Sequence, residues 1–275
     1  MKFIDMHTHS TASDGVYRPK ELVEYALEKG LSGIAITDHD TIDGIEEAVD
    51  HASIYKDFIV IPGIELSAEY HGEEVHILGY GIDYKNSSLK EKLRYLEKER
   101  RDRAYKIVSK LNSMGMKLDY ESIMQTVQNG VVGRPHIARA LVEHGYVKNL
   151  EEAFNKYLAQ DAAAYVPRAK LSPQEAIGLI KAARGISVLA HPGLIQSDKI
   201  IEDILTLGID GIEVYHSEHT GSLSRKFLEM AEEHNLFVTA GSDFHFPPDN
   251  DESYHGDLGS IKISLDSIQK LFRRA

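Results

Sequence analysis

The chain has 275 residues, of which 42% are hydrophobic and 27% charged, the composition of a globular protein with a sizeable core. It contains no cysteine, so disulfides and thiolate ligands are excluded and any metal must bind to nitrogen and oxygen. The formal net charge of −12 argues against a broad nucleic-acid-binding surface, so a polyanionic substrate would need metals or a local arginine cluster.

No segment approaches the roughly 20 consecutive apolar residues of a membrane span. The N-terminus also lacks a basic region followed by an apolar run, which is the pattern of a secretory signal. We therefore expect a cytoplasmic protein that does not associate with a membrane and needs no obligate protein partner.

The first third of the chain alternates strand-like and helix-like patterns. Pro19 suits the first turn of a helix, and Gly30 suits the position just after its end. Residues 58–70 and 73–82 are two strand-like runs so close together that we expect a tight connection within one sheet. The predicted elements, in order, cover residues 2–7, 18–30, 31–40, 41–55, 58–70 and 73–82.

The same alternation returns in the last third of the chain. Ser172, Pro173 and Glu175 form an S-x-x-E capping box with proline in the first turn. Such alternation predicts a parallel sheet flanked by helices, and about seven strands of this kind can close into a barrel. The predicted elements cover residues 172–185, 186–192, 199–208, 209–216, 222–235 and 236–245.

The alternation of strand and helix patterns stops between the first and last thirds of the chain, where the pattern becomes entirely helical. Residues 88–115 have the pattern of one long charged helix that ends near Gly115. We therefore predict an α/β fold in which residues 1–88 and 166–275 form a barrel domain and residues 89–165 an inserted helical subdomain. The shorter helices of this insertion are expected over residues 120–128, 134–145 and 150–160.

Histidines and carboxylates gather at the ends of the predicted strands. His7 and His9 are two residues apart on a strand, so both point to one face, about 6.5 to 7 Å apart along the backbone. The carboxyl ends of parallel strands converge on one mouth of a barrel, where active sites are found. Any one of these residues could be an ordinary hydrogen-bonded polar group, but six strand ends of this kind indicate a site. The other members are Asp38, His39, Asp40, Glu65, His76, His191, Asp243 and His245.

In combination and in this order, the stretches HTHS…SDG, TDHDT, PGIELS, HILGY, GRPHIARAL, LAHPG and GSDFH resemble the PHP (polymerase and histidinol phosphatase) family, and within it the stand-alone metal-dependent phosphoesterases. This resemblance implies a distorted (β/α) barrel that holds two to three divalent metals, with Glu65 as a bridging carboxylate. The implied ligands are His7, His9, Asp14, His39, Glu65, His76, His191, Asp243 and His245.

Imidazole and carboxylate ligands without thiolate suit Mn, Fe or Zn, and clusters of such ions activate water for attack on phosphorus. We hypothesise that a metal-bridging hydroxide attacks the phosphate and that no phospho-enzyme forms. Arg134 and His136 are expected to contact the phosphate, and His216 to contact the phosphate or leaving group, with the general acid as one role. Phe246 is a candidate for stacking on a nucleobase, and Arg168 is a weaker candidate contact.

Three function classes follow from these residues and the resemblance. The leading class is a phosphoesterase for small monoesters, with 5'-mononucleotides, 3',5'-bisphosphonucleotides or short RNA ends as the substrates that the resemblance implies. The second is a histidinol phosphatase, which uses the same chemistry. The third is a non-catalytic metal-binding partner module. The loop over residues 246–258 borders the predicted site and leaves the substrate preference open.

Overall fold

A computed structural model describes residues 2–126, 132–167, 170–247 and 256–268 of the chain. The chain divides into two compact units. The first unit comprises Met1–Glu91 together with Lys170–Ala275, and the second comprises Lys92–Ala169. Within the described ranges, no helix has both the length and the apolar character needed to cross a membrane.

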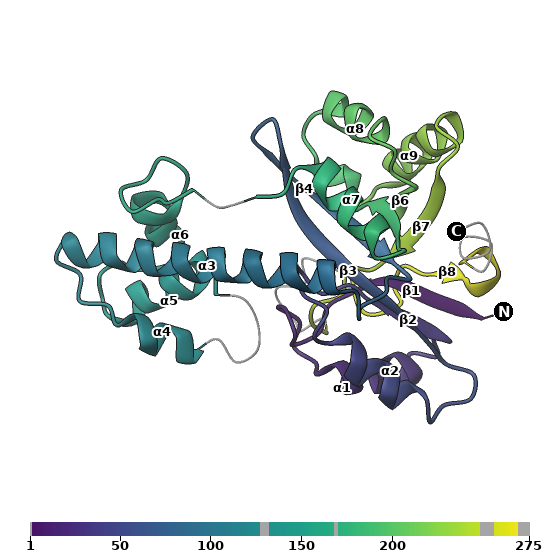
Figure 1. Cartoon of the computed structure of the whole chain (residues 1–275), viewed down its shortest axis with the longest axis horizontal. Helices are drawn as coiled ribbons and strands as arrows, with labels where there is room; N and C mark the ends of the chain where they lie inside the picture. The colour runs from purple at the N-terminus through teal and green to yellow at the C-terminus, as the bar shows by residue number, and fades with distance from the viewer. Residues whose placement is uncertain (1, 127–131, 168–169, 248–255, 269–275) are drawn as a thin grey trace. The chain divides into compact units, whose positions relative to one another are not determined.

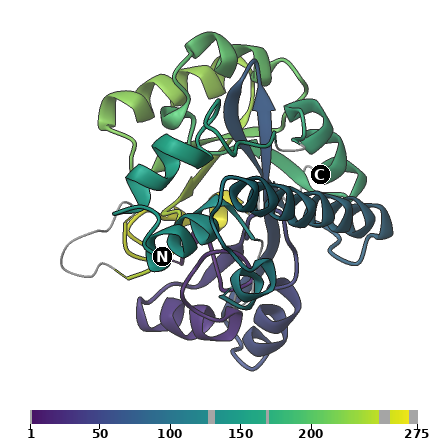
Figure 2. The same cartoon turned by 90° about the vertical axis from the view of Figure 1, so that its left-hand side faces the viewer.

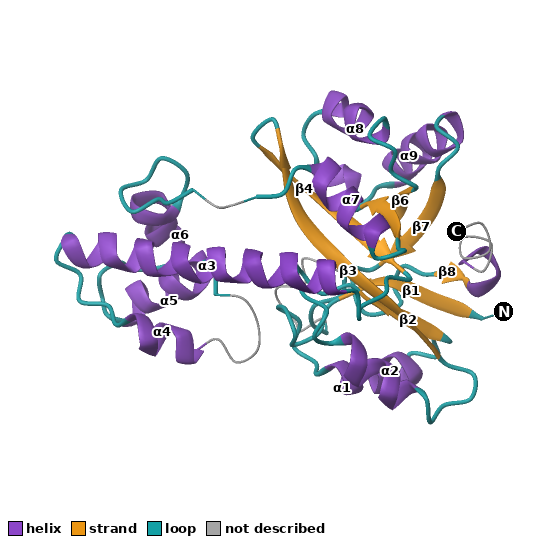
Figure 3. Ribbon diagram, in the orientation of Figure 1, coloured by secondary structure: helices purple, strands orange, loops and turns teal. Residues whose placement is uncertain are grey.

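The first unit is built around one eight-stranded sheet, whose strands are orange in Figure 3. The strands follow the spatial order β7-β6-β5-β4-β3-β2-β1-β8. Their bounds are Phe3–Thr8 (β1), Gly33–Ile36 (β2), Ile59–Tyr70 (β3), Glu73–Tyr80 (β4), Ile186–Leu189 (β5), Gly211–His216 (β6), Phe237–Gly241 (β7) and Ile263–Ser264 (β8).

The predicted tight connection between residues 58–70 and 73–82 makes β4 run antiparallel to β3, and β4 is antiparallel to β5 as well. In this connection, Tyr70 pairs with Glu73 and leaves a loop of His71 and Gly72. Both loop residues have positive φ, 51° and 86°, as in the two-residue turns that join antiparallel strands. The pairs β1–β2, β2–β3, β5–β6 and β6–β7 are parallel, as predicted.

The sheet curves until its two sides nearly meet, which confirms the predicted barrel. Beyond the end of β7, Phe244 forms a parallel bridge with Thr8 of β1, and its carbonyl accepts a hydrogen bond from His9 N at 2.9 Å. The structure has eight strands instead of about seven because the two-residue β8 adds to the edge of β1. Apolar side chains fill the interior, among them Ile4, Met6, Ala35, Ile61, Leu78 and Val188.

Helices cover the outside of this sheet, and the predicted caps position two of them. Pro19 occupies the first position of α1, and Gly30 follows its end with φ 72°. The predicted capping box starts α7, where Ser172 Oγ accepts a hydrogen bond from Glu175 N at 3.2 Å. Helices α1 and α2 pack side by side, which both views show (Figure 1) (Figure 2). The helices are Pro19–Glu28 (α1), Ile45–Ala52 (α2), Pro173–Ala182 (α7), Asp198–Leu205 (α8), Gly221–Glu233 (α9) and the 3₁₀ turn Pro192–Leu194 (η2).

In the second unit, all regular structure of the described residues is helical. The predicted long helix is α3, which begins in the first unit and ends before Gly115, where φ is 93°. A separate apolar core holds the unit together, with Ile107, Leu111, Ile137 and Leu141 fully or nearly fully buried. The elements are Ser87–Ser113 (α3), Tyr120–Thr126 (α4), Arg134–Glu143 (α5), Leu150–Ala153 (α6) and the π-helix Phe154–Leu158 (η1).

Candidate metal centre

The strands of the first unit bring the predicted ligands to one end of the barrel. His7 lies in β1 and His9 follows this strand, while His191 follows β5 and Asp243 follows β7. His76 lies in the first half of β4 and still reaches the same end, because β4 runs antiparallel to its neighbours. The sequence pattern therefore selected residues that the fold does bring together.

Glu65 lies at the middle of this cluster and is completely buried. Its Oε1 is 2.9 Å from His76 Nδ1 and 2.9 Å from His191 Nε2. Its Oε2 is 3.0 Å from His39 Nδ1 and 3.3 Å from the Nε2 atoms of both His7 and His9. A single carboxylate thus faces five imidazoles, with each oxygen directed toward a different subset of them.

Two further carboxylates complete the cluster. Asp243 Oδ1 is 3.2 Å from His7 Nε2 and 3.0 Å from His9 Nε2. Asp14 Oδ1 is 3.3 Å from His245 Nε2, and Asp14 Oδ2 is 3.8 Å from His39 Nε2. The Asp14 side chain is 56% exposed, whereas Asp243 is almost buried, so this end of the cluster opens to solvent beside Asp14.

These contacts define four overlapping groups of donor atoms close enough to share an ion. Within each group the donor atoms lie within 4.8 Å of one another. Four groups around the shared residues Glu65, His7, His9 and His39 could hold more than one metal. The groups are His9, Asp14, His39 and His245; His7, His9, Glu65 and Asp243; His39, Glu65 and His76; and His7, Glu213 and His216.

The donor atoms fit divalent metal ions better than a hydrogen-bonded polar core. Glu65 Oε2 lies 3.0–3.3 Å from His7 Nε2, His9 Nε2 and His39 Nδ1, yet none of these four buried atoms makes a hydrogen bond among the described residues. Burying such groups without partners is costly, and a bound cation would satisfy several of them at once. Nitrogen and carboxylate donors are the ligand types of Mn, Fe and Zn.

Burial and the close contacts between carboxylates and imidazoles shift the pKa values of the cluster. Burial by itself raises the pKa of Glu65, but His39, His76 and His7 outweigh it and hold that pKa well below its usual range. Burial lowers the pKa of His39 to about 3, despite the opposing effect of Glu65. His39 is therefore neutral near pH 7, as a metal ligand must be.

Several buried aspartates near the cluster hold the backbone. Asp38 accepts hydrogen bonds from Ser10 N at 2.7 Å and from Ser13 Oγ at 2.7 Å, which holds the loop that carries Asp14. Asp5 accepts a hydrogen bond from Ser242 N at 3.0 Å, next to Asp243. The sequence marked Asp38 as a strand-end residue but assigned it no task, because hydrogen-bond partners distant in the chain are not visible in sequence.

Glu213 is the buried acid that sequence reasoning missed. It lies in β6, is completely buried, and has Oε1 3.1 Å from His7 Nδ1. The signal that could have pointed to it is a charged residue between the apolar residues Ile212 and Val214 of a predicted strand. His216, which was predicted, lies at the end of the same strand with Nε2 3.5 Å from Asp243 Oδ2.

The predicted phosphate contacts Arg134 and His136 lie in the second unit, at the start of α5. Arg134 Nη1 donates a hydrogen bond to the carbonyl of Leu158 at 3.2 Å. His136 Nδ1 accepts a hydrogen bond from Gly133 N at 3.2 Å, so the neutral ring carries its proton on Nε2. Both residues thus have local partners that orient them within their own unit.

Phe246 is half-buried and follows His245 directly, in the first unit. His219 uses both ring nitrogens: Nδ1 donates to the Val214 carbonyl at 3.0 Å, and Nε2 accepts from Gly193 N at 3.1 Å. This arrangement explains His219 as a structural residue. Arg168, and residues 248–255 of the predicted loop over 246–258, lie outside the described residues.

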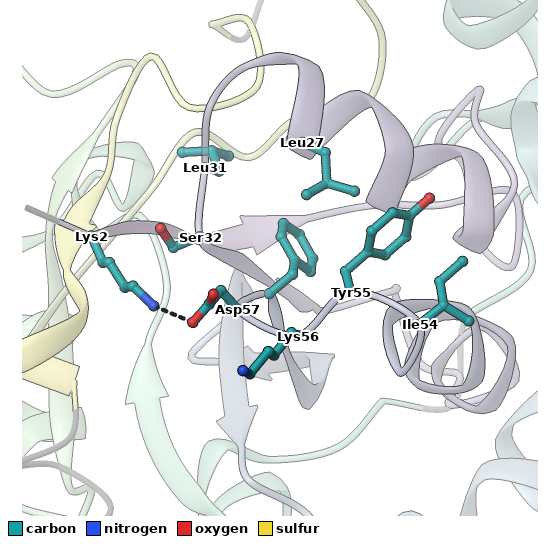
Figure 4. A pocket seen from close by; sticks show the side chains of 9 residues that line it. Lys2, Leu27, Leu31, Ser32, Ile54, Tyr55, Lys56 and Asp57 are labelled. Atoms are coloured by element: carbon teal, nitrogen blue, oxygen red, sulfur yellow. Dashed lines mark hydrogen bonds and ion pairs between the residues drawn. The ribbon is translucent and has the colours of Figure 1, made fainter.

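A hollow of about 450 Å³ lies at the opposite end of the parallel strands (Figure 4). Lys2, Ser32 and Phe58, which line it, directly precede β1, β2 and β3. Its charged residues include Lys2 and Asp57, which form an ion pair at 2.9 Å. Active sites of barrels form at the other end of the strands, so this hollow is not the reaction site.

The arrangement at the carboxyl ends of the strands is that of a metal-dependent hydrolase. The family model of the PHP domain matches residues 5–202, and the chain belongs to this family. Together with the relatives that follow, which include a phosphatase and an exoribonuclease, this match makes the chain a hydrolase of phosphate esters, and its donor groups are those of divalent metals.

Three relatives extend this comparison over nearly the whole chain. A 3',5'-nucleoside bisphosphate phosphatase of Chromobacterium violaceum is 34% identical over 253 residues, which cover 90% of this chain and 88% of that protein. A 5'-3' exoribonuclease of Haemophilus influenzae is 37% identical over 251 residues, 90% of this chain and 91% of that protein. The crystal structure of a Bifidobacterium adolescentis protein assigned as a metal-dependent phosphoesterase has a TM-score of 0.81 at 30% identity, covering 99% of this chain and 96% of that one.

Proposed function

We propose that this phosphoesterase acts on nucleotides, removing a phosphate from a 3',5'-bisphosphonucleotide or a 5'-mononucleotide, or cutting the ends of short RNA. The observation that carries the metal-dependent chemistry is the position of Glu65, whose two oxygens face five imidazoles within 2.9–3.3 Å. The relatives named above support the substrate class, since one is a nucleotide phosphatase and another an exoribonuclease.

The proposed metal centre holds two to three ions of Mn, Fe or Zn. When bound, such ions polarise the phosphoryl oxygens and lower the pKa of a coordinated water. The overlap of the donor groups supports more than one ion, because Glu65 belongs to two of them. The proposed ligands are His7, His9, Asp14, His39, Glu65, His76, His191, Asp243 and His245.

His216 is proposed as the residue that protonates the leaving group. Its Nδ1 accepts a hydrogen bond from Glu218 N at 3.2 Å, so the neutral ring carries its proton on Nε2. This Nε2 lies 3.5 Å from Oδ2 of the proposed ligand Asp243, so a proton donor stands beside the proposed metal centre.

The helical insertion over residues 89–165 is proposed to cap the site and to bring Arg134 and His136 to the phosphate. An arginine fork suits the oxygens of a phosphate, and burial together with Arg139 lowers the pKa of His136, so this ring is neutral and can donate a hydrogen bond. Phe246, next to His245, is proposed to stack on the nucleobase. A cytoplasmic location remains a prediction from the sequence.

The test is release of phosphate or nucleotide by Mn-loaded protein from four substrates in parallel. These are a 3',5'-bisphosphonucleotide, a 5'-mononucleotide, a short 5'-phosphorylated RNA and histidinol phosphate. We expect turnover of a nucleotide or RNA substrate that is lost in Glu65→Gln, and an increased KM with unchanged metal content in Arg134→Ala.

Other outcomes would select the alternatives. Preference for histidinol phosphate would make the protein a histidinol phosphatase. No turnover of any of the four by protein that has bound its metals would contradict the nucleotide proposal and favour another phosphate ester as substrate or a non-catalytic role. Phe246→Ala separates base recognition from chemistry, since we expect it to raise KM for nucleotides and leave histidinol phosphate unaffected.

A further inference from the structure

We propose that Glu213 is a positioning residue, which holds two of the proposed metal ligands, His7 and His191, in the geometry that the metals need. This inference rests on the metal centre of the proposed function. Glu213 lies in β6 and is completely buried, as is His7, which it contacts from the side opposite to Glu65.

The contact with His7 selects which ring nitrogen is available to a metal. His7 Nδ1 lies 3.1 Å from Glu213 Oε1 and 3.3 Å from Oε2. A carboxylate accepts hydrogen bonds, so the Nδ1 atom keeps its proton and donates it to Glu213. The lone pair is then on Nε2, which is 3.3 Å from Glu65 Oε2 and 3.2 Å from Asp243 Oδ1. A carboxylate behind a metal-binding imidazole fixes its orientation and increases its basicity.

The contact with His191 holds a strained piece of backbone. Glu213 Oε2 accepts a hydrogen bond from His191 N at 2.8 Å. His191 has φ 24° and ψ 60°, which is an unfavourable conformation for a residue with a side chain. This conformation directs His191 Nε2 toward Glu65 Oε1 at 2.9 Å. Glu213 therefore connects β6 to a ligand on β1 and to another that follows β5.

A bulge in β6 places Glu213 and His216 on the same side of the strand. In a regular strand, residues three apart point to opposite faces. The pairing of β6 with β7 shifts register between Glu213 and Tyr215, which inserts one residue. Donor atoms of Glu213 and His216 consequently both lie within 4.8 Å of a nitrogen of His7. A reader of the sequence who assumes regular alternation along the strand would place Glu213 and His216 on opposite faces.

Donor atoms of His7, Glu213 and His216 lie close enough together that Glu213 could itself be a metal ligand. Its hydrogen bonds argue against this role. Its Oε1 faces His7 Nδ1, and its Oε2 faces His191 N. The nitrogen of His7 that faces Glu65 is Nε2, on the other side of the ring. Glu213 thus acts through the ligands that it contacts.

The experiment compares Mn binding in wild-type protein, Glu213→Ala, Glu213→Gln and the control Ile212→Val. Ile212 is completely buried and precedes Glu213 in the same strand, so its side chain points to the opposite face and its substitution lowers stability by another route. Two quantities are measured: the number of ions bound at saturating Mn, by elemental analysis, and the dissociation constant, by competition with a chelator. Thermal unfolding of each variant checks that it is folded.

We expect Glu213→Ala to weaken Mn binding about 10- to 100-fold with the number of ions at saturation unchanged. Glu213→Gln should lose less affinity than Glu213→Ala, because its single amide oxygen still accepts one of the two hydrogen bonds that Glu213 accepts from His7 Nδ1 and His191 N. Ile212→Val should bind Mn as wild type does. Equal losses of Mn affinity in Glu213→Ala and Ile212→Val would show that Glu213 contributes only to stability and does not position the ligands. Loss of a whole ion at saturation in Glu213→Gln would make it a ligand. Wild-type protein that binds no Mn would contradict the metal centre itself, which distinguishes the two failures.

Discussion

Substitution of Gly241, the last residue of β7, tests how closely β7 and β1 pack beside the metal centre. A Cβ at this position would lie 2.2 Å from His7 Cβ, 2.6 Å from His7 N and 2.9 Å from His7 Cα. Two of these three atoms belong to the backbone of β1, so no rotation of a side chain can relieve the overlap. Gly241→Ala must therefore push β7 and β1 apart by about 1 Å to restore an ordinary contact.

The expected loss in the free energy of unfolding has two parts, which are overpacking of the core and weaker hydrogen bonds between the two sides of the barrel. Overpacking of a tight core costs about 1–3 kcal/mol. Separation of the strands also strains the hydrogen bonds from His9 N to the Phe244 carbonyl (2.9 Å) and from Phe244 N to the His7 carbonyl (3.3 Å). Each of these contributes about 1 kcal/mol. We expect Gly241→Ala to lower the free energy of unfolding by about 3–5 kcal/mol, a large part of the total stability of a domain.

The matched control is the same substitution where there is space. Gly178 lies inside α7, and a Cβ there would have no neighbour within 4 Å. Gly178→Ala should stabilise the protein by about 0.5–1 kcal/mol, because alanine loses less backbone entropy in a helix.

Urea unfolding followed by circular dichroism measures both variants, since the chain has no tryptophan. Gly241→Ala should also lose bound Mn, because it displaces His7. The reasoning is refuted if Gly241→Ala is within about 1 kcal/mol of wild type and keeps its metal.

Three further predictions concern the ligands, pH and local structure. Glu65→Gln removes the charge that faces five imidazoles, and we expect a loss of Mn affinity of about 100-fold or more, measured by chelator competition. Metal affinity should rise with pH up to about pH 10. Although burial lowers both values, Asp243 and Glu65 raise the pKa of His9 to about 10, and Glu65 raises the pKa of His76 to about 9. These protons must leave before a metal binds, so affinity is lost as pH falls, and calorimetry in two buffers should detect proton release. Ser172→Ala removes the cap of α7 and should cost about 1 kcal/mol in urea unfolding, with metal content unchanged.

Each of these predictions has a contradicting result. If Glu65→Gln bound Mn with wild-type affinity, Glu65 would not be part of the metal centre. Metal binding without proton release would show that the imidazoles are already neutral in the metal-free protein. Loss of metal in Ser172→Ala, which lies at the start of an outer helix, would mean that the metal centre depends on general stability and not on its own contacts.

The sequence by itself determined the elements and the residues that carry the chemistry. Periodicity, Pro19, Gly30 and the capping box of Ser172 are local signals, and the helices begin and end where these signals predict, because such caps act through neighbouring residues. His7 and His9 stood out for a similar reason. Two imidazoles on one face of a strand near its end are recognisable without knowing what they face.

Only the tertiary structure decided the relations between distant segments. It showed that β4 runs antiparallel and so brings His76 to the same mouth as Glu65. It also revealed the bulge in β6, through which Glu213 reaches His7, 206 positions away in the chain. These contacts depend on strand direction, register and closure of the barrel, which are set by the packing of the whole sheet and leave no periodic signal in any single segment.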